Sequence, residues 1–167
     1  MTTRLIKNGS LVADNWVLVN TTTGVDDIAM LQDQDVIVPL SFWLTEQQLI
    51  RSRPAKTAVW LNSHETPEAI AESLDTLPLV ALNFPEFKDG RPFSSARELR
   101  QRFAYPGEIR AIGDVLRDQL FFMQRCGFDA FALRDDQDVD SALSAFNDFS
   151  NVYQPAIDQP LPLFRRR

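Results

Sequence analysis

Short apolar runs alternate with amphipathic stretches along most of this chain. From Val36 onward, strand-like runs occur at VIVPL, TAVWLN, LVALNF, EIRAIG and AFAL, and helix-like stretches occur at TEQQLIRS, TPEAIAESLDTL, SSARELRQRFAY, DVLRDQLFFMQRCG and DVDSALSAFNDFS. This alternation predicts an α/β domain with a mostly parallel sheet built from four to five βα units. An open sheet and a partial TIM-like barrel share this pattern, so the sequence leaves both architectures open.

The first 35 residues have a different pattern. Asn8-Gly9 lies between two apolar runs, which is the strongest short signal of a β-hairpin, and residues 16–19 predict a third short strand. The predicted division is one domain at residues 1–154, comprising a hairpin region at 1–35 and βα repeats at 36–154, followed by a proline-rich tail at 155–167.

Capping residues predict where the helices begin and end. Ser95 with Glu98 is typical of a capping box, and Asp114 is a suitable N-cap for the helix that follows it. Gly127 is expected to end that helix, because glycine adopts positive φ without strain.

Composition narrows the possible partners and cofactors. A formal net charge of −6 argues against nucleic acid as a partner, since phosphate binding needs an extended basic face. No apolar run is long enough to cross a bilayer, so we expect a cytoplasmic protein without a membrane partner. A single cysteine, Cys126, and a single histidine, His64, cannot supply the ligand set of a metal or iron–sulfur site. With no dinucleotide or P-loop fingerprint either, we expect no metal and no cofactor.

Basic residues are concentrated in residues 83–129, which hold eight of the 17 lysines and arginines. A local cationic segment in an acidic protein indicates a small anion or an acidic partner surface. We call residues 83–129 the basic segment.

Polar residues follow the predicted strands, and ligands of parallel α/β sheets bind outside the carboxyl ends of the strands. In one hypothesis this rim binds a small oxyanion or anionic metabolite: Arg91 and Arg117 clamp it, Asn83 is a hydrogen-bond partner, and Asp89 and Asp114 hold the arginines. The simpler interpretation is that Asp89-Gly90 is a turn and that Asp114 and Arg117 form a helix-surface pair. No residue is assigned a catalytic role, and whether the protein is an enzyme stays open.

In the alternative hypothesis the protein is a non-catalytic adaptor. Asp118, Phe121 and Arg125 would share one helix face and form its partner surface. A concave pocket lined by several rim loops would favour anion binding, whereas a flat rim would favour the adaptor.

Two long motifs resemble a known bacterial family. They are LNFPEFKDGRPFSSARELRQRF and GEIRAIGDVLRDQLFFMQRCGFDAFAL, and the ending PLPLFRRR accompanies them. Over residues 60–151 the chain is similar to the domain of unknown function 934 family, whose members are labelled probable oxidoreductases of sulfite reduction and are encoded beside assimilatory sulfite reductase. The resemblance implies an accessory protein of assimilatory sulfite reduction, with sulfite reductase or its electron donor as partner.

Overall fold

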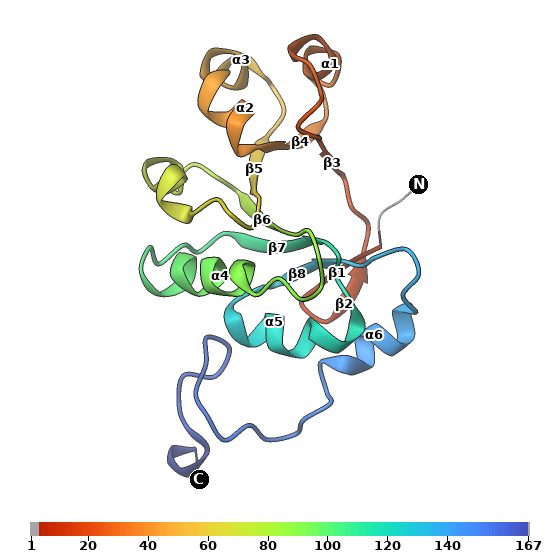
Figure 1. The fold of residues 1–167 in the computed structure, drawn as a ribbon, viewed down its shortest axis with the longest axis vertical. Coiled ribbons are helices and arrows are strands. Elements are labelled where there is room, and N and C mark those ends of the chain that lie inside the picture. The colour runs from red at the N-terminus through yellow and green to blue at the C-terminus, as the bar shows by residue number, and fades with distance from the viewer. Residues whose placement is uncertain (1–3, 167) are drawn as a thin grey trace.

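Eight strands form one curled sheet in the computed structural model, which describes residues 4–166 (Figure 1). The strands are β1 (Leu5–Lys7), β2 (Ser10–Val12), β3 (Trp16–Leu18), β4 (Asp35–Pro39), β5 (Thr57–Leu61), β6 (Leu79–Phe84), β7 (Glu108–Gly113) and β8 (Ala130–Ala132). The helices are α1 (Val25–Met30), α2 (Leu40–Thr45), α3 (Gln47–Ser52), α4 (Arg91–Gln101), α5 (Leu120–Cys126) and α6 (Val139–Ala145), with 3₁₀ helices η1 (Pro67–Ser73), η2 (Arg117–Gln119) and η3 (Leu163–Arg165).

Strand order follows the chain across most of the sheet. The order is β2-β1-β8-β7-β6-β5-β4-β3, in which β3 to β8 pair in parallel and β1 pairs antiparallel with both β2 and β8. The α/β class is confirmed, but the expected mostly parallel sheet is wrong: the sheet is partly antiparallel, because the N-terminal hairpin contributes the antiparallel pairs β1–β2 and β1–β8. In a doubly wound sheet the strand order reverses, and helices then cover both faces. Here the order of the parallel strands never reverses, so right-handed crossovers place all the connecting helices on one face.

The two edge strands of the sheet are neighbours in the chain. Only Ala13, Asp14 and Asn15 separate β2 from β3. Four Cα–Cα steps span at most about 14 Å, so the two edges must approach one another and the sheet must curl. The sheet therefore corresponds to the barrel-like alternative that the sequence left open.

Each strand turns alternate side chains to the two faces of the sheet, as pleating requires. The outer face packs against the helices and includes Val36, Val38, Val59, Leu61, Val80 and Leu82. The inner face forms a second buried cluster, to which the helices contribute no residue: Ile37, Ala58, Trp60, Leu79, Ala81 and Ile112, flanked by Trp16 and Ala132.

The predicted turn and helix ends are partly confirmed. Asn8 and Gly9 both adopt positive φ in the hairpin turn between β1 and β2, and Gly127 ends α5 with φ of 112°. The capping box at Ser95 is wrong, because α4 begins four residues earlier with Pro92 in its first turn. Asp114 does not cap a helix either, since Leu116 precedes η2.

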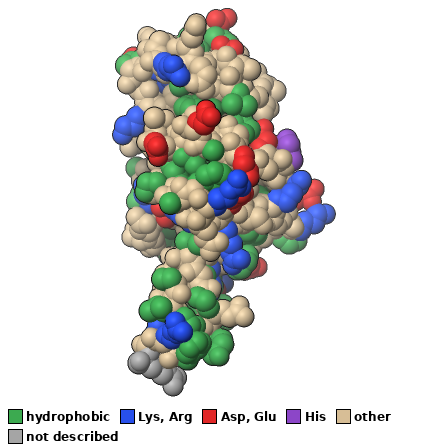
Figure 2. All heavy atoms as spheres, turned by 90° about the vertical axis from the view of Figure 1, so that its left-hand side faces the viewer, with side chains coloured by type: hydrophobic (Ala, Val, Ile, Leu, Met, Phe, Trp, Pro, Cys, Tyr) green, Lys and Arg blue, Asp and Glu red, His purple; other side chains and the backbone are tan. Residues whose placement is uncertain are grey.

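Residues 149–166, which we call the tail lobe, fold back on themselves beside α5. The Arg125 Nη2 donates to the Gln154 carbonyl at 2.6 Å, and the Ile157 amide donates to the Arg125 carbonyl at 3.1 Å. The Leu163 amide donates to the Tyr153 carbonyl at 3.1 Å and closes the lobe. The lobe projects from the body of the protein (Figure 2). No helix within residues 4–166 combines the length and apolarity that crossing a membrane requires.

Candidate functional site

The carboxyl ends of β5 to β8 meet at one rim of the sheet, as the parallel pairing requires. Asn83 near the end of β6 donates from Nδ2 to the Oδ1 of Asn62, which follows β5, at 3.2 Å. The same Asn62 oxygen accepts the Ser63 amide at 2.9 Å. Asn83 is half-buried, and its bond to Asn62 joins the carboxyl ends of β5 and β6.

Arg91 and Asp89 form the predicted pair at this rim. Arg91 Nε and Nη2 donate to the two carboxylate oxygens of Asp89 at 2.9 and 2.7 Å. These bonds hold the pKa of Asp89 well below its ordinary value and raise the pKa of Arg91. The Arg91 side chain is 62% exposed, so its remaining N–H groups face solvent.

A depression of 420 Å³ lies beside this pair at the start of α4. Its lining residues all come from the β6–α4 connection and the first residue of α4: Pro85, Glu86, Lys88, Asp89 and Arg91. Lys88 pairs with Glu86 at 3.1 Å, so both cations of the depression already have carboxylate partners. A pocket lined by several rim loops was the criterion that favours anion binding. A single connection forms this depression, so it does not meet that criterion.

Arg117 and Asp114 do not form the predicted helix-surface pair. Arg117 instead donates from Nη1 and Nη2 to Asp148 beyond α6, at 2.7 and 2.8 Å, and this contact raises the pKa of Arg117. Asp114 accepts the Phe87 amide at 2.8 Å and pairs with Arg134. The two proposed clamp arginines are thus committed to different carboxylates.

Arg134 is a rim residue that the sequence reasoning did not select. It follows β8 and donates to Asp136 through Nε and Nη2 at 2.6 and 2.7 Å, and to Asp114 through Nη1. These hydrogen bonds raise the pKa of Arg134 and lower that of Asp136. The sequence could have indicated Arg134, because this residue directly follows AFAL, the last strand-like apolar run.

The predicted partner surface is not assembled as one exposed face. Asp118 is exposed in η2, but Phe121 is half-buried against Phe149, with ring centroids 5.0 Å apart. Arg125 is buried because the tail lobe covers it, and it contacts Asp158 at 3.5 Å. Arg125 anchors the tail and is not available to a partner.

Seven of the eight basic side chains of the basic segment pair with a carboxylate of the same chain, so little of its positive charge is unpaired at the surface. Arg110 and Arg125 are buried, and Arg100 donates to three backbone carbonyls, those of Gly127, Tyr105 and Gly107, at 3.0, 2.7 and 2.7 Å. Much of this positive charge therefore stabilises the fold.

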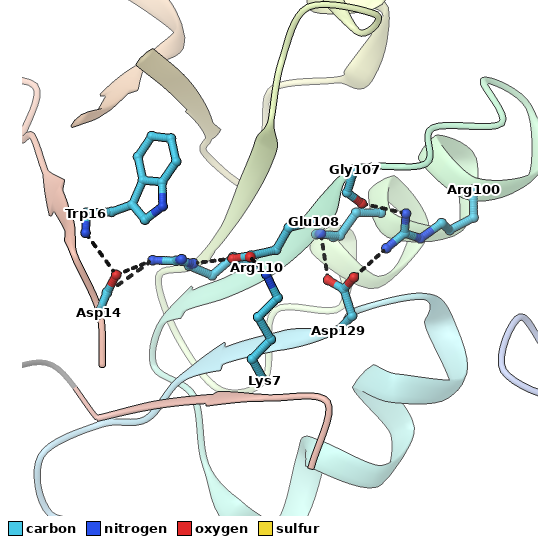
Figure 3. Close-up of polar contacts among 9 residues, drawn as sticks. Lys7, Asp14, Trp16, Arg100, Gly107, Glu108, Arg110 and Asp129 are labelled. Carbon is cyan, nitrogen blue, oxygen red and sulfur yellow. Dashed lines mark hydrogen bonds and ion pairs between the residues drawn. The ribbon is translucent and has the colours of Figure 1, made fainter. Parts of the chain in front are cut away.

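Four charged side chains form a network on the inner face of the sheet, at the amino ends of the parallel strands (Figure 3). Arg110 Nη1 donates to both carboxylate oxygens of Asp14 at 3.0 and 3.1 Å, and its Nε donates to Glu108 at 2.7 Å. The other Glu108 oxygen contacts Lys7 Nζ at 2.6 Å. The network joins β1, β7 and the β2–β3 connection, so it closes the curl opposite the rim.

A second network in Figure 3 centres on Asp129, which precedes β8. Its carboxylate accepts the Ile109 amide at 2.8 Å and contacts Arg100 Nη2 at 3.3 Å. Burial raises the pKa of Asp129. The contacts attach α4 to the start of β7.

His64 is exposed, whereas Cys126 is buried and burial raises the pKa of its thiol. Within residues 4–166, no group of three or more His, Cys, Asp or Glu side chains is arranged to hold a metal ion.

The fold and rim define an α/β protein whose consecutive parallel strands curl around a closed inner cluster. Residues 58–164 match the family model described as "Bacterial protein of unknown function (DUF934)", and the chain belongs to this family. It is also 33% identical over 87 residues to the Ethylene-responsive transcription factor ERF010 of Arabidopsis thaliana. That similarity spans 46% of each chain, so the protein covers about half the length of this relative.

Proposed function

We propose that this protein is a non-catalytic adaptor of assimilatory sulfite reduction, which docks on sulfite reductase or its electron donor through the carboxyl rim of its sheet. The pathway rests on the sequence resemblance. The observation that carries the adaptor role is that Arg91, Arg117 and Arg134 each pair with a carboxylate of the same chain. A small anion would have to displace these carboxylates, whereas a protein partner accommodates a mosaic of paired charges.

Contacts between the rim loops support a continuous docking surface. The Phe87 amide and the Arg134 guanidinium both donate to Asp114, which connects the loops after β6, β7 and β8. Loops fixed in this way lose little conformational entropy when a partner binds.

The direct test is calorimetry of the full chain with purified sulfite reductase, and separately with its electron donor. We expect binding to one of them, with an affinity that falls as salt is added. Arg117→Ala and Arg134→Ala should weaken it, and Lys56→Ala should not, because Lys56 is exposed at the amino end of the sheet. Absence of binding to both proteins would refute the adaptor role.

Anion binding is a second candidate, favoured by the depression in which Lys88 and Arg91 lie at the start of the eleven-residue helix α4. Titration with sulfite, sulfate and phosphate separates the two functions. Saturable binding that Arg91→Ala abolishes and Arg91→Lys retains in part would establish the anion site, since lysine lacks the planar fork. The adaptor hypothesis expects no saturable binding.

A further inference from the structure

A cavity of 290 Å³ opens on the inner face of the sheet, at the amino ends of the parallel strands. Asp35 and Arg110 line it, and each lies two residues before a member of the inner cluster, so both side chains turn inward with that cluster. Trp16, the first residue of β3, lines it as well (Figure 3). We call this cavity the amino mouth, and its principal lining residues are Lys7, Asp14, Trp16, Asp35, Glu108 and Arg110. It lies at the opposite end of the curl from the rim.

The two basic side chains of the amino mouth keep hydrogen-bond donors that no group within residues 4–166 accepts. The Arg110 side chain is only 3% exposed, and it donates to Glu108 through Nε and to Asp14 through Nη1. Its Nη2 has no partner in the described part of the chain. Lys7 Nζ contacts one oxygen of Glu108, which leaves two of its three N–H groups without a protein acceptor there. A ligand oxygen in the cavity would satisfy these donors.

The amino mouth also holds a carboxylate that lacks a cationic partner. Asp35 Oδ1 accepts the Lys56 amide at 2.9 Å, and this is a neutral donor. Arg53 attracts Asp35 from beyond ion-pair distance, but its guanidinium donates to three backbone carbonyls. No basic side chain within residues 4–166 forms an ion pair with Asp35, so its Oδ2 is open to a positively charged donor of a ligand.

We propose that the amino mouth binds a free α-amino acid with an apolar side chain. The ligand carboxylate accepts from Arg110 Nη2 and Lys7 Nζ, the ligand ammonium donates to Asp35, and the ligand side chain packs against Trp16 and Val12. An anion alone would meet three carboxylates that only two basic side chains offset, and a cation alone would leave the basic donors unsatisfied. A zwitterion satisfies both sets of groups. Because the site is remote from the rim, this inference does not rest on the adaptor function.

Calorimetric titration of the full chain with leucine, methionine and phenylalanine tests the proposal. We expect saturable binding of at least one of these amino acids. For the tightest of them, two analogues are the matched controls: the amine that lacks the carboxylate and the acid that lacks the amino group. Each analogue should bind about tenfold more weakly or worse, because it loses a charge-assisted hydrogen bond. Absence of saturable binding by all three amino acids would overturn the proposal, and so would an analogue that binds as tightly as its parent.

Matched variants locate the site. Lys7→Gln removes the ammonium group, and Asp35→Asn removes the negative charge but keeps an acceptor for the Lys56 amide. Each variant should weaken binding by about tenfold or more. Lys56→Gln and Asp33→Asn make the same changes at exposed side chains outside the cavity, and both should bind as the wild type does. Wild-type affinity in Lys7→Gln or in Asp35→Asn would overturn the proposal, as would an equal loss in the control variant.

A measurement on the unchanged chain covers the case in which a variant fails to fold. Nuclear magnetic resonance follows the indole N–H signals of the ¹⁵N-labelled wild type during titration with the same amino acid. The Trp16 signal should shift saturably. The Trp43 signal should stay in place, because Trp43 belongs to α2 and packs with the outer cluster. An unmoved Trp16 signal, or a Trp43 shift as large as that of Trp16, would overturn the proposal.

Discussion

Replacing Asp14 by alanine tests whether the inner-face charge network closes the sheet. The Arg110 and Asp14 side chains are only 3% and 7% exposed, and the variant removes both acceptors of Arg110 Nη1. Removing one partner of a buried ion pair lowers the free energy of unfolding by about 3–5 kcal/mol, because the other charge is left buried without a partner. Because Arg110 keeps Glu108 as a partner, we expect the lower end, about 3 kcal/mol.

Urea unfolding and thermal scans measure this loss. For a chain of this size, about 3 kcal/mol corresponds to a fall in the thermal midpoint of about 6–12 °C. Asp33→Ala is the control, because Asp33 is exposed, and it should stay within about 0.5 kcal/mol of the wild type. Asp14→Leu combined with Arg110→Met should be more stable than Asp14→Ala, since it removes the unpaired guanidinium as well.

The reasoning is refuted if Asp14→Ala costs no more than Asp33→Ala. The network would then be an incidental contact, and closure of the curl would rest on the apolar inner cluster alone. A double variant less stable than Asp14→Ala would equally contradict the stated cause, because the unpaired charge would not be the source of the loss.

Three further outcomes are expected. Gly113→Ala should cost about 2 kcal/mol or more in urea unfolding, because Gly113 has φ of 87° and an added Cβ would lie 2.4 Å from the Phe84 carbonyl oxygen. Cys126 should react with Ellman's reagent only after unfolding, since burial shields the thiol and raises its pKa; fast reaction of the native protein would contradict this. The pKa of Asp129 is raised in the folded protein, so folding favours the protonated carboxyl group. The free energy of unfolding of the wild type, relative to that of Asp129→Asn, should therefore fall as the pH rises through the folded-state pKa. Urea unfolding at a series of pH values measures this difference, and a difference that does not fall would show that the pKa is not raised.

The sequence predicted the strands better than the short helices. Strands β4 to β7 are apolar runs bounded by polar residues, so each is visible without knowledge of its neighbours. Helices α1 and α2 have six residues each, fewer than two turns, and such segments are too short to show a 3.6-residue period. Ser95 and Glu98 have the spacing of a capping box but lie inside α4, because the same spacing also occurs in helix interiors.

The site was predictable only where its contacts are local. Arg91 and Asp89 are two residues apart, so their pairing could be inferred from the turn. Arg117 bonds a carboxylate 31 residues away, and Arg110 bonds one 96 residues away. Those partners depend on which elements the curled sheet brings together, and this is also why the charge of a basic run in the sequence is largely neutralised by carboxylates distant in the chain.

Pairing of β1 with β8 has a consequence for how the chain folds during synthesis. Leu5 lies opposite Ala132 in the sheet, so β1, which is made before the other seven strands of this sheet, gains this partner only after residues 8–129 have emerged. Until then the β1–β2 hairpin has a free edge, while β3 to β7 can pair in the order of their synthesis. Such distant contacts slow folding, because the loop-closure entropy is lost before the contact forms. One edge of β1 therefore stays unpaired during synthesis until β8 is made.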